Sequence, residues 1–172
     1  MNIVLIGFMG TGKTAVADAL ARRLGWERID TDALIVERAG MSIPDIFAQD
    51  GEPHFRDLET AVIRDLAGKR RCVVSTGGGC VMRVDNLRAL RATGTVISLA
   101  ARPDVIMARC KGDTNRPLLQ GENPLATIHE LLGLRSPLYA QAHHTVDTSD
   151  LTIDQVVDAI VALVPGMSGK KS

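Results

Sequence analysis

The sequence contains few aromatic residues and no excess of either charge. Phe, Trp and Tyr make up 3% of its 172 residues, and 20 Lys and Arg balance 20 Asp and Glu, so the formal net charge is zero. Proteins that bind nucleic acid usually carry excess positive charge and often stack bases on aromatic rings. We therefore expect no nucleic-acid partner.

Cysteines and long apolar runs are also scarce. The sequence has three cysteines, an odd number, and they lack the C-x-x-C spacing of many metal and redox sites: Cys72, Cys80 and Cys110. No apolar run approaches the ~18 residues of a membrane span, and the N-terminus reads as a strand rather than as a signal peptide. These absences favour a soluble protein of the reducing cytoplasm, without a membrane partner.

The length of the chain suggests one domain, which can bury about 70% of its unfolded surface without disulfides or a structural metal. We expect this domain to span residues 1–164. Residues 165–172 are small and polar, which predicts a disordered tail.

Glycines concentrate near the N-terminus, where residues 7–14 read G-F-M-G-T-G-K-T. This matches G-x-x-x-x-G-K-[ST], the phosphate-binding loop of P-loop nucleotide enzymes. Residues 1–6 form an apolar run typical of a buried strand, and apolar residues at helical spacing predict a helix from Lys13 to Leu24. The motif is meaningful only between a strand and a helix, and that context is present.

Such a loop binds anions through its backbone. Its N–H groups converge on phosphate oxygens, and the positive end of the following helix dipole points to the same place. Lys13 can add a charge for the β- and γ-phosphates, and the Thr14 hydroxyl can bind Mg²⁺. We expect the nucleotide to contact a run of six residues: Gly10, Thr11, Gly12, Lys13, Thr14 and Ala15.

Strand and helix patterns alternate along the rest of the chain. Short apolar runs predict strands at 26–30, 72–75, 95–99 and 145–147, and helical spacing predicts helices at 33–39, 43–49, 55–66, 85–92, 103–109, 124–134, 138–142 and 153–164. This alternation predicts a three-layer α/β fold, with a parallel sheet flanked by helices on both faces. Ligands bind at the carboxyl ends of the strands in such a sheet.

Two further polar features follow predicted strands, so we expect them beside the phosphate loop. Asp30 and Asp32 suit a division in which one carboxylate lies near Mg²⁺ and the other faces a substrate hydroxyl, although Asp also caps helices and both roles can hold. Gly77, Gly78 and Gly79 cost roughly 0.5–1 kcal/mol each relative to alanine. This cost favours bare backbone beside a ligand over a plain tight turn.

Arginines give the strongest indication of substrate charge. A planar guanidinium binds a carboxylate through two parallel hydrogen bonds, which a lysine cannot make. Taken singly, each arginine is more often a solvated surface residue. Four of them lie next to motifs or loops and are candidates for anion binding: Arg56, Arg109, Arg116 and Arg135.

Taken together, the motifs resemble those of the shikimate kinase family. Besides the phosphate loop, the chain has D-T-D at 30–32, F-R at 55–56, G-G-G at 77–79, R-P-L at 116–118 and R-x-P-L-Y at 135–139. The resemblance extends from Ile3 to about Val164. It implies a nucleoside-monophosphate-kinase-like fold with five parallel strands. It also implies transfer of the γ-phosphoryl group of ATP to the 3-hydroxyl of shikimate, a step of chorismate and aromatic amino-acid synthesis.

The resemblance also implies roles for individual residues. Lys13 and Thr14 would hold the phosphates and Mg²⁺, and Asp30 would support the metal through water. Asp32 would bind the ring hydroxyls as the candidate base, so that Lys13, Asp32 and Arg116 are the implied catalytic residues. The nucleotide would also contact Arg109, stacked on adenine, and Arg116, which would lie on a lid at about 111–123.

For the acceptor, the resemblance implies a carboxylate clamp made by Arg56 and Arg135. Amides of the glycine run 77–79 would also face shikimate, Glu59 would brace Arg56, and Phe47 and Phe55 would line the pocket. The substrate-binding helices would span about 32–62. Shikimate kinases are often monomers, and the sequence gives no reason to expect otherwise.

Two alternatives share the phosphate loop. The first is a gluconate-type or nucleoside-monophosphate kinase, a function that would leave the carboxylate clamp beside the glycine run unexplained. A GTP-dependent switch requires a guanine-reading N-K-x-D motif, which the sequence lacks.

Overall fold

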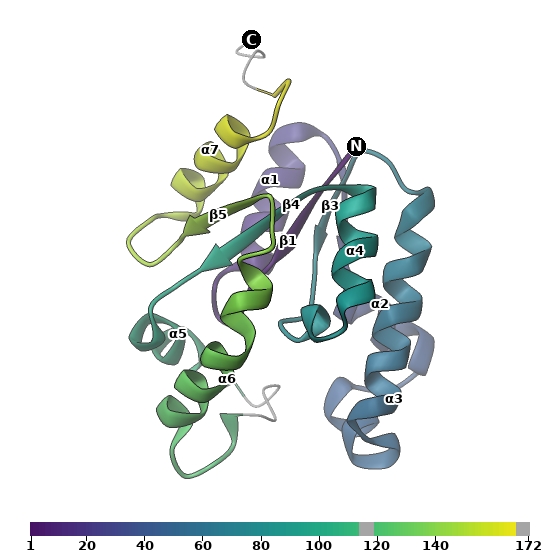
Figure 1. Cartoon of the computed structure of the whole chain (residues 1–172), viewed down its shortest axis with the longest axis vertical. Helices are drawn as coiled ribbons and strands as arrows, with labels where there is room; N and C mark the ends of the chain where they lie inside the picture. The colour runs from purple at the N-terminus through teal and green to yellow at the C-terminus, as the bar shows by residue number, and fades with distance from the viewer. Residues whose placement is uncertain (114–118, 168–172) are drawn as a thin grey trace.

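The computed structural model describes residues 1–113 and 119–167 of the chain. In that part, five strands form one sheet in the order β2-β3-β1-β4-β5, and every neighbouring pair is parallel (Figure 1). The predicted α/β class with a five-stranded parallel sheet is confirmed. The strands are β1 (Asn2–Ile6), β2 (Glu27–Asp30), β3 (Cys72–Ser75), β4 (Gly94–Ala100) and β5 (His144–Asp147).

Helices cover both faces of the sheet. They are α1 (Lys13–Leu24), α2 (Thr31–Ala39), α3 (Ile43–Asp65), α4 (Val84–Thr93), α5 (Pro103–Cys110), α6 (Pro124–Tyr139) and α7 (Ile153–Leu163), with short 3₁₀ turns η1 (Leu66–Gly68) and η2 (Cys80–Met82).

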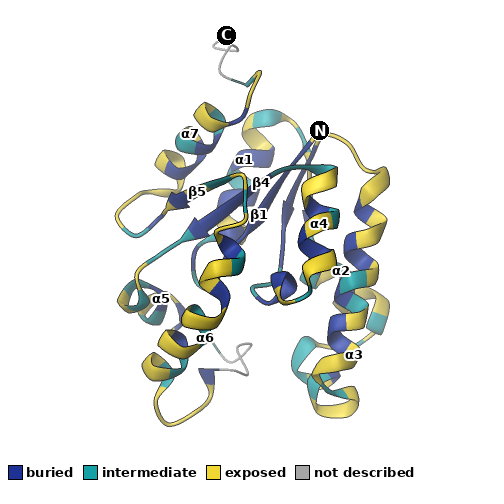
Figure 2. Ribbon diagram, viewed as in Figure 1, coloured by how far each residue is buried: buried dark blue, intermediate teal, exposed yellow. Residues whose placement is uncertain are grey.

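The central strand β1 shows why two layers of helices are needed. All five of its residues are buried (Figure 2). Four of them are apolar, and alternate side chains of a strand point to opposite faces of the sheet. Ile3 and Leu5 pack with α1 and α7, whereas Val4 and Ile6 pack with α3, α4 and α6. A strand buried on both faces reads as a continuous apolar run, as the sequence does here.

The helix α3 contains a break at Gly51, where the backbone has φ 82° and ψ 168°. This agrees with the turn expected between helices at 43–49 and 55–66. The second segment begins directly after Gly51, earlier than predicted, because Pro53 falls within its first turn, where a missing N–H costs no intrahelical hydrogen bond.

The helix α6 differs from the predicted helix boundaries. We expected separate helices at 124–134 and 138–142, but α6 runs without interruption to Tyr139. Pro137 lies in the last turn of the helix, so its missing N–H removes only the single hydrogen bond that the Gly133 carbonyl would accept.

All three cysteines are buried and carry free thiols. Burial raises the pKa of the Cys80 thiol to about 12, and it also raises the pKa of Cys72. Across the described ranges, no helix is both long and apolar enough to cross a lipid bilayer.

Candidate active site

The phosphate loop connects β1 to α1 at the carboxyl end of the sheet. Gly10 and Gly12 have φ angles of 74° and 94°, in the left-handed region that residues with a Cβ rarely adopt. A Cβ on Gly10 would also lie only 2.7 Å from the Cys110 sulfur. The first turn of α1 contains no acidic residue, so the helix terminus suits an anion.

The side chain of Lys13 turns back across this loop. Its Nζ donates hydrogen bonds to the carbonyl oxygens of Gly7 at 2.7 Å and Phe8 at 2.8 Å, and the residue is 9% exposed. The hydroxyl of Thr11 donates to the same Phe8 carbonyl at 2.7 Å. The loop therefore forms around its own lysine and places a positive charge at the end of α1.

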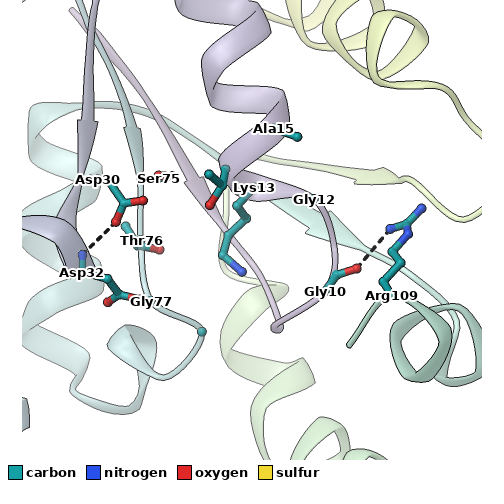
Figure 3. A pocket seen from close by; sticks show the side chains of 12 residues that line it. Gly10, Gly12, Lys13, Ala15, Asp30, Asp32, Ser75, Thr76, Gly77 and Arg109 are labelled. Carbon is teal, nitrogen blue, oxygen red and sulfur yellow. Dashed lines mark hydrogen bonds between the residues drawn. The ribbon is translucent and has the colours of Figure 1, made fainter. Parts of the chain in front are cut away.

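A cavity of about 270 Å³ lies where this loop meets the carboxyl ends of β2 and β3 (Figure 3). Ser75 and Thr76 contribute to it, although they were not predicted as site residues. Their position at the end of β3 was the signal that could have identified them. The full lining consists of Gly10, Gly12, Lys13, Thr14, Ala15, Asp30, Asp32, Ser75, Thr76, Gly77, Gly78 and Arg109.

Asp30 caps the helix α2. One of its carboxylate oxygens accepts from the amides of Asp32 at 2.9 Å and Ala33 at 3.2 Å, and the other lies 3.3 Å from an Arg28 nitrogen. The capping role that we weighed against a functional one is therefore present, and the fixed carboxylate still lines the cavity.

Asp32 lies in the first turn of α2, against the glycine run. A Cβ built on Gly77 would lie 2.8 Å from the Asp32 Oδ1 atom and 2.9 Å from the Glu59 Oε2 atom. Only a glycine leaves room for both carboxylates at this point of the backbone. The Gly77 amide itself donates to the Thr31 hydroxyl at 3.3 Å.

Arg56 is held by two glutamates of its own helix. Its guanidinium donates to Glu59 at 2.9 Å and to Glu52 at 3.2 Å, and the Glu59 side chain is fully buried. A Cβ on Gly79 would lie 2.7 Å from the Arg56 Cζ atom, so Gly79 allows the guanidinium to pack directly on the backbone.

The Glu59 carboxyl has a strongly shifted pKa. Burial raises this pKa from 4.5 to about 7 and nearby Asp32 adds to the rise, while Arg56 opposes it. The folded protein therefore holds a proton on Glu59 between pH 4.5 and 7 more often than the unfolded chain does. By linkage, this group makes the free energy of unfolding fall as the pH rises through that interval.

We expect Glu59→Gln to abolish this contribution, because an amide does not titrate there. As the pH rises from 4.5 to 7, the free energy of unfolding of the variant should increase by about 2 to 3 kcal/mol relative to that of the parent protein. Urea denaturation at several pH values measures this difference. Parallel pH profiles for the two proteins would contradict the prediction.

Arg135, on α6, is a second buried cation next to the glycine run. It is 4% exposed, its guanidinium carbon lies 5.7 Å from the centre of the Phe8 ring, and its Nη1 atom lies 3.7 Å from a Cβ built on Gly78. Within residues 1–113 and 119–167, it forms no salt bridge and its Nε atom has no hydrogen-bond partner. A buried charge without a counter-ion is costly and suits an anionic ligand.

Arg109 and Thr148 join the nucleotide side of the cavity to the rest of the sheet. The Arg109 guanidinium donates to the Thr148 hydroxyl and carbonyl, both at 3.0 Å, and to the Gly10 carbonyl at 3.1 Å. The Thr148 hydroxyl lies 3.0 Å from the carbonyl oxygens of both Thr11 and Ala100. Thr148 directly follows β5, but no sequence motif marks it as a functional residue.

The remaining predicted residues lie near this cavity or outside the described part. Phe47 and Phe55 pack against each other, with ring centroids 4.9 Å apart, and the Arg56 guanidinium lies over the Phe55 ring at 5.1 Å. Thr11, within the phosphate loop, is buried. Arg116 and the centre of the expected lid lie outside the described residues.

A parallel α/β sheet with a glycine-rich phosphate loop, flanked by carboxylates and buried arginines, defines a P-loop phosphotransferase. A family model described as "Shikimate kinase" matches residues 9–165. A shikimate kinase of Thermodesulfovibrio yellowstonii is 45% identical over 171 residues, which cover 99% of each chain. The chain therefore belongs to the shikimate kinase family and is a phosphotransferase with an alcohol acceptor and ATP as co-substrate.

Solved structures agree with this assignment. The shikimate kinase of Acinetobacter baumannii, solved in complex with shikimate, matches with a TM-score of 0.91 and 39% identity, over 94% of this chain and 91% of that one. A gluconokinase of Sinorhizobium meliloti 1021 has a TM-score of 0.63 and 19% identity over 94% and 89% of the two chains. This second likeness supports the fold but not gluconate as a substrate.

Proposed function

We propose that this protein transfers the γ-phosphoryl group of ATP to the 3-hydroxyl of shikimate, with the acid held between Arg56, Arg135 and the glycine run. The observation that carries this proposal is the buried guanidinium of Arg135 next to the phosphate cavity, which forms no salt bridge within residues 1–113 and 119–167. Guanidinium groups bind a carboxylate with two directed hydrogen bonds. A small acid bound there would lie beside Asp32 and the phosphate loop.

On the nucleotide side, the proposed contacts are made by the phosphate loop and by Arg109. The amides of the loop and Lys13 would bind the β- and γ-phosphates. Arg109 would present its guanidinium plane to the adenine, since its nitrogens are fixed by Thr148 and Gly10. Arg116 would reach the phosphates from the segment 111–123 and help to exclude water.

The residues present suit a magnesium ion. Thr14 and Asp30 line the cavity and offer the oxygen donors that Mg²⁺ prefers. The remaining ligands of the ion would be phosphate oxygens and water. Because both Asp30 oxygens already accept hydrogen bonds, Asp30 would act through a water molecule. When bound, Mg²⁺ supplies positive charge that neutralises the phosphates.

On the acceptor side, Asp32 would orient the attacking hydroxyl and accept its proton. Phosphoryl transfer passes through a loose transition state, so positioning and charge stabilisation provide most of the catalysis. The base therefore acts largely by holding the hydroxyl in line with the γ-phosphate. Its place against Gly77 fixes the carboxylate for this task.

A steady-state assay of ADP release, with and without shikimate, tests this function. We expect ADP release to depend on shikimate, with gluconate unable to replace it in the same assay. Release that is independent of shikimate would exclude the proposal. Light scattering of the purified protein would test the related expectation of a monomer.

We expect Arg135→Ala to raise the KM for shikimate about thirtyfold and to leave the KM for ATP within about twofold. The reason is that a desolvated partner of the carboxylate is lost, a change typically worth about 2 kcal/mol or more. Arg88→Ala is a suitable control, because Arg88 is 78% exposed and pairs with Asp85 on the same helix. An unchanged KM for shikimate in the Arg135 variant would contradict the clamp.

A further inference from the structure

The glycine run is connected to α6 by one side chain that the proposed mechanism does not use. Tyr139 lies at the end of α6, one turn after Arg135, and is 7% exposed. Its hydroxyl donates a hydrogen bond to the carbonyl oxygen of Gly78 and also interacts with the side chain of Arg135. Burial raises the pKa of Tyr139, so the phenol remains protonated and can donate throughout the neutral pH range.

This hydrogen bond fixes the direction of a peptide plane. In a trans peptide, the carbonyl oxygen and the following amide hydrogen point in opposite directions, and every peptide bond in the described part of the chain is trans. Because the Gly78 carbonyl points to Tyr139 on α6, the N–H group of Gly79 points away from it. Glycine has little preference of its own, so this peptide depends on an external partner for its orientation.

The Gly79 amide is an oriented donor in a buried position. Gly79 is buried, and neither its N–H nor that of Gly78 donates a hydrogen bond to another residue in the described ranges. Buried amides are nearly always paired. The Arg56 guanidinium lies against Gly79 and that of Arg135 lies near Gly78, so an acid bound by the two arginines would meet these amides.

We propose that Tyr139 is a positioning residue, whose hydroxyl turns the Gly78–Gly79 peptide so that the Gly79 amide donates to the carboxylic acid bound by Arg56 and Arg135. This inference rests on the proposed acceptor site and deepens it. Tyr139 acts through the backbone rather than by contact with the substrate. It also couples α6, which carries Arg135, to the loop that follows β3.

The variant Tyr139→Phe tests this role because it keeps the buried ring and removes only the hydroxyl. We expect the KM for shikimate to rise about five- to tenfold, the usual effect of one hydrogen bond, with the KM for ATP unchanged. A purely structural role would lower the melting temperature and shift both KM values alike. A KM for shikimate equal to that of the parent protein would overturn the inference.

Thr148→Val provides a matched comparison on the nucleotide side, since it also removes one buried hydroxyl and nearly preserves the side-chain shape. It removes one of the three hydrogen bonds that hold Arg109, so we expect a higher KM for ATP and an unchanged KM for shikimate. The opposite selectivity of the two variants would separate a local effect of Tyr139 from general loosening of the site. If both variants raised both KM values equally, the positioning role would be refuted.

A direct readout comes from NMR of protein labelled with ¹⁵N-glycine. In the parent protein, we expect the Gly79 amide proton to shift downfield when shikimate binds, and in Tyr139→Phe we expect most of this shift to disappear. A full shift in the variant would show that the peptide orients without the hydroxyl. If the parent protein neither used nor bound shikimate, the proposed function itself would fail, which is a different result from a parent-like Tyr139→Phe.

Discussion

Replacing Lys13 with alanine should reduce kcat for phosphoryl transfer by about 10³-fold or more, because a charge positioned at the transferring phosphate is lost. The structure adds a second reason. Lys13 donates to the carbonyl oxygens of Gly7 and Phe8, so its removal also loosens the loop whose amides would bind the phosphates. The coupled ADP assay at saturating ATP and shikimate measures the effect.

Lys69→Ala serves as the control for this variant. Lys69 is an exposed lysine that pairs with Glu27 at 3.2 Å, so its loss should leave kcat unchanged. Circular dichroism of Lys13→Ala distinguishes a folded, inactive protein from an unfolded one. A folded Lys13 variant that kept more than a tenth of the parental kcat would argue against the phosphate role.

Asp32→Asn should lower kcat by about 10²- to 10⁴-fold, the range typical for a positioned general base. The amide keeps the size of the side chain and its place against Gly77, so we expect a smaller change in the KM for shikimate. Single-turnover measurements of phosphoryl transfer would separate the chemical step from product release.

Asp57→Asn is the matched comparison. Asp57 lies on the helix α3, its side chain is 70% exposed, and it pairs with Arg83 at 2.8 Å. It should retain parental kcat. Similar losses in the Asp57 and Asp32 variants would mean that the assay reports general destabilisation, and full activity of Asp32→Asn would remove this residue from the mechanism.

Much of the fold could be predicted because local sequence patterns identify the buried strands. The runs at 2–6, 72–75 and 94–100 are apolar on both faces, and only a sheet between two helical layers buries such runs. The order of the strands was not predictable in this way. It depends on which strands pair across long stretches of chain, and no local pattern encodes that choice.

Helix boundaries were less predictable, and proline explains why. The predicted helix boundaries at 55, 134 and 138 lie close to Pro53 and Pro137. The cost of a proline depends on its place in the helix: in the first turn it removes no intrahelical hydrogen bond, whereas further along it removes one and its ring crowds the carbonyl four residues earlier. The sequence reveals the proline, but not how far it lies from the end that tertiary packing selects.

Some residues of the candidate site could be predicted from the sequence, and others could not. Lys13, Asp30, Asp32 and the glycine run belong to motifs, and they meet because strand ends share one edge of the sheet. Thr148 and the link between Tyr139 and Gly78 depend on contacts between segments 39 to 137 residues apart. Such contacts leave no pattern in the sequence, because a single hydroxyl at a strand or helix end is common.

The burial of all three cysteines has a practical consequence for studying this protein. Cys72 and Cys80 have no exposed surface and Cys110 has 7%, and a thiol must be both accessible and deprotonated to react with maleimides. A single cysteine introduced on an exposed helix position should therefore take up a fluorophore or spin label selectively, without prior replacement of the native thiols. Distance measurements between α3 and α6 with and without substrates would then be open to direct spectroscopy.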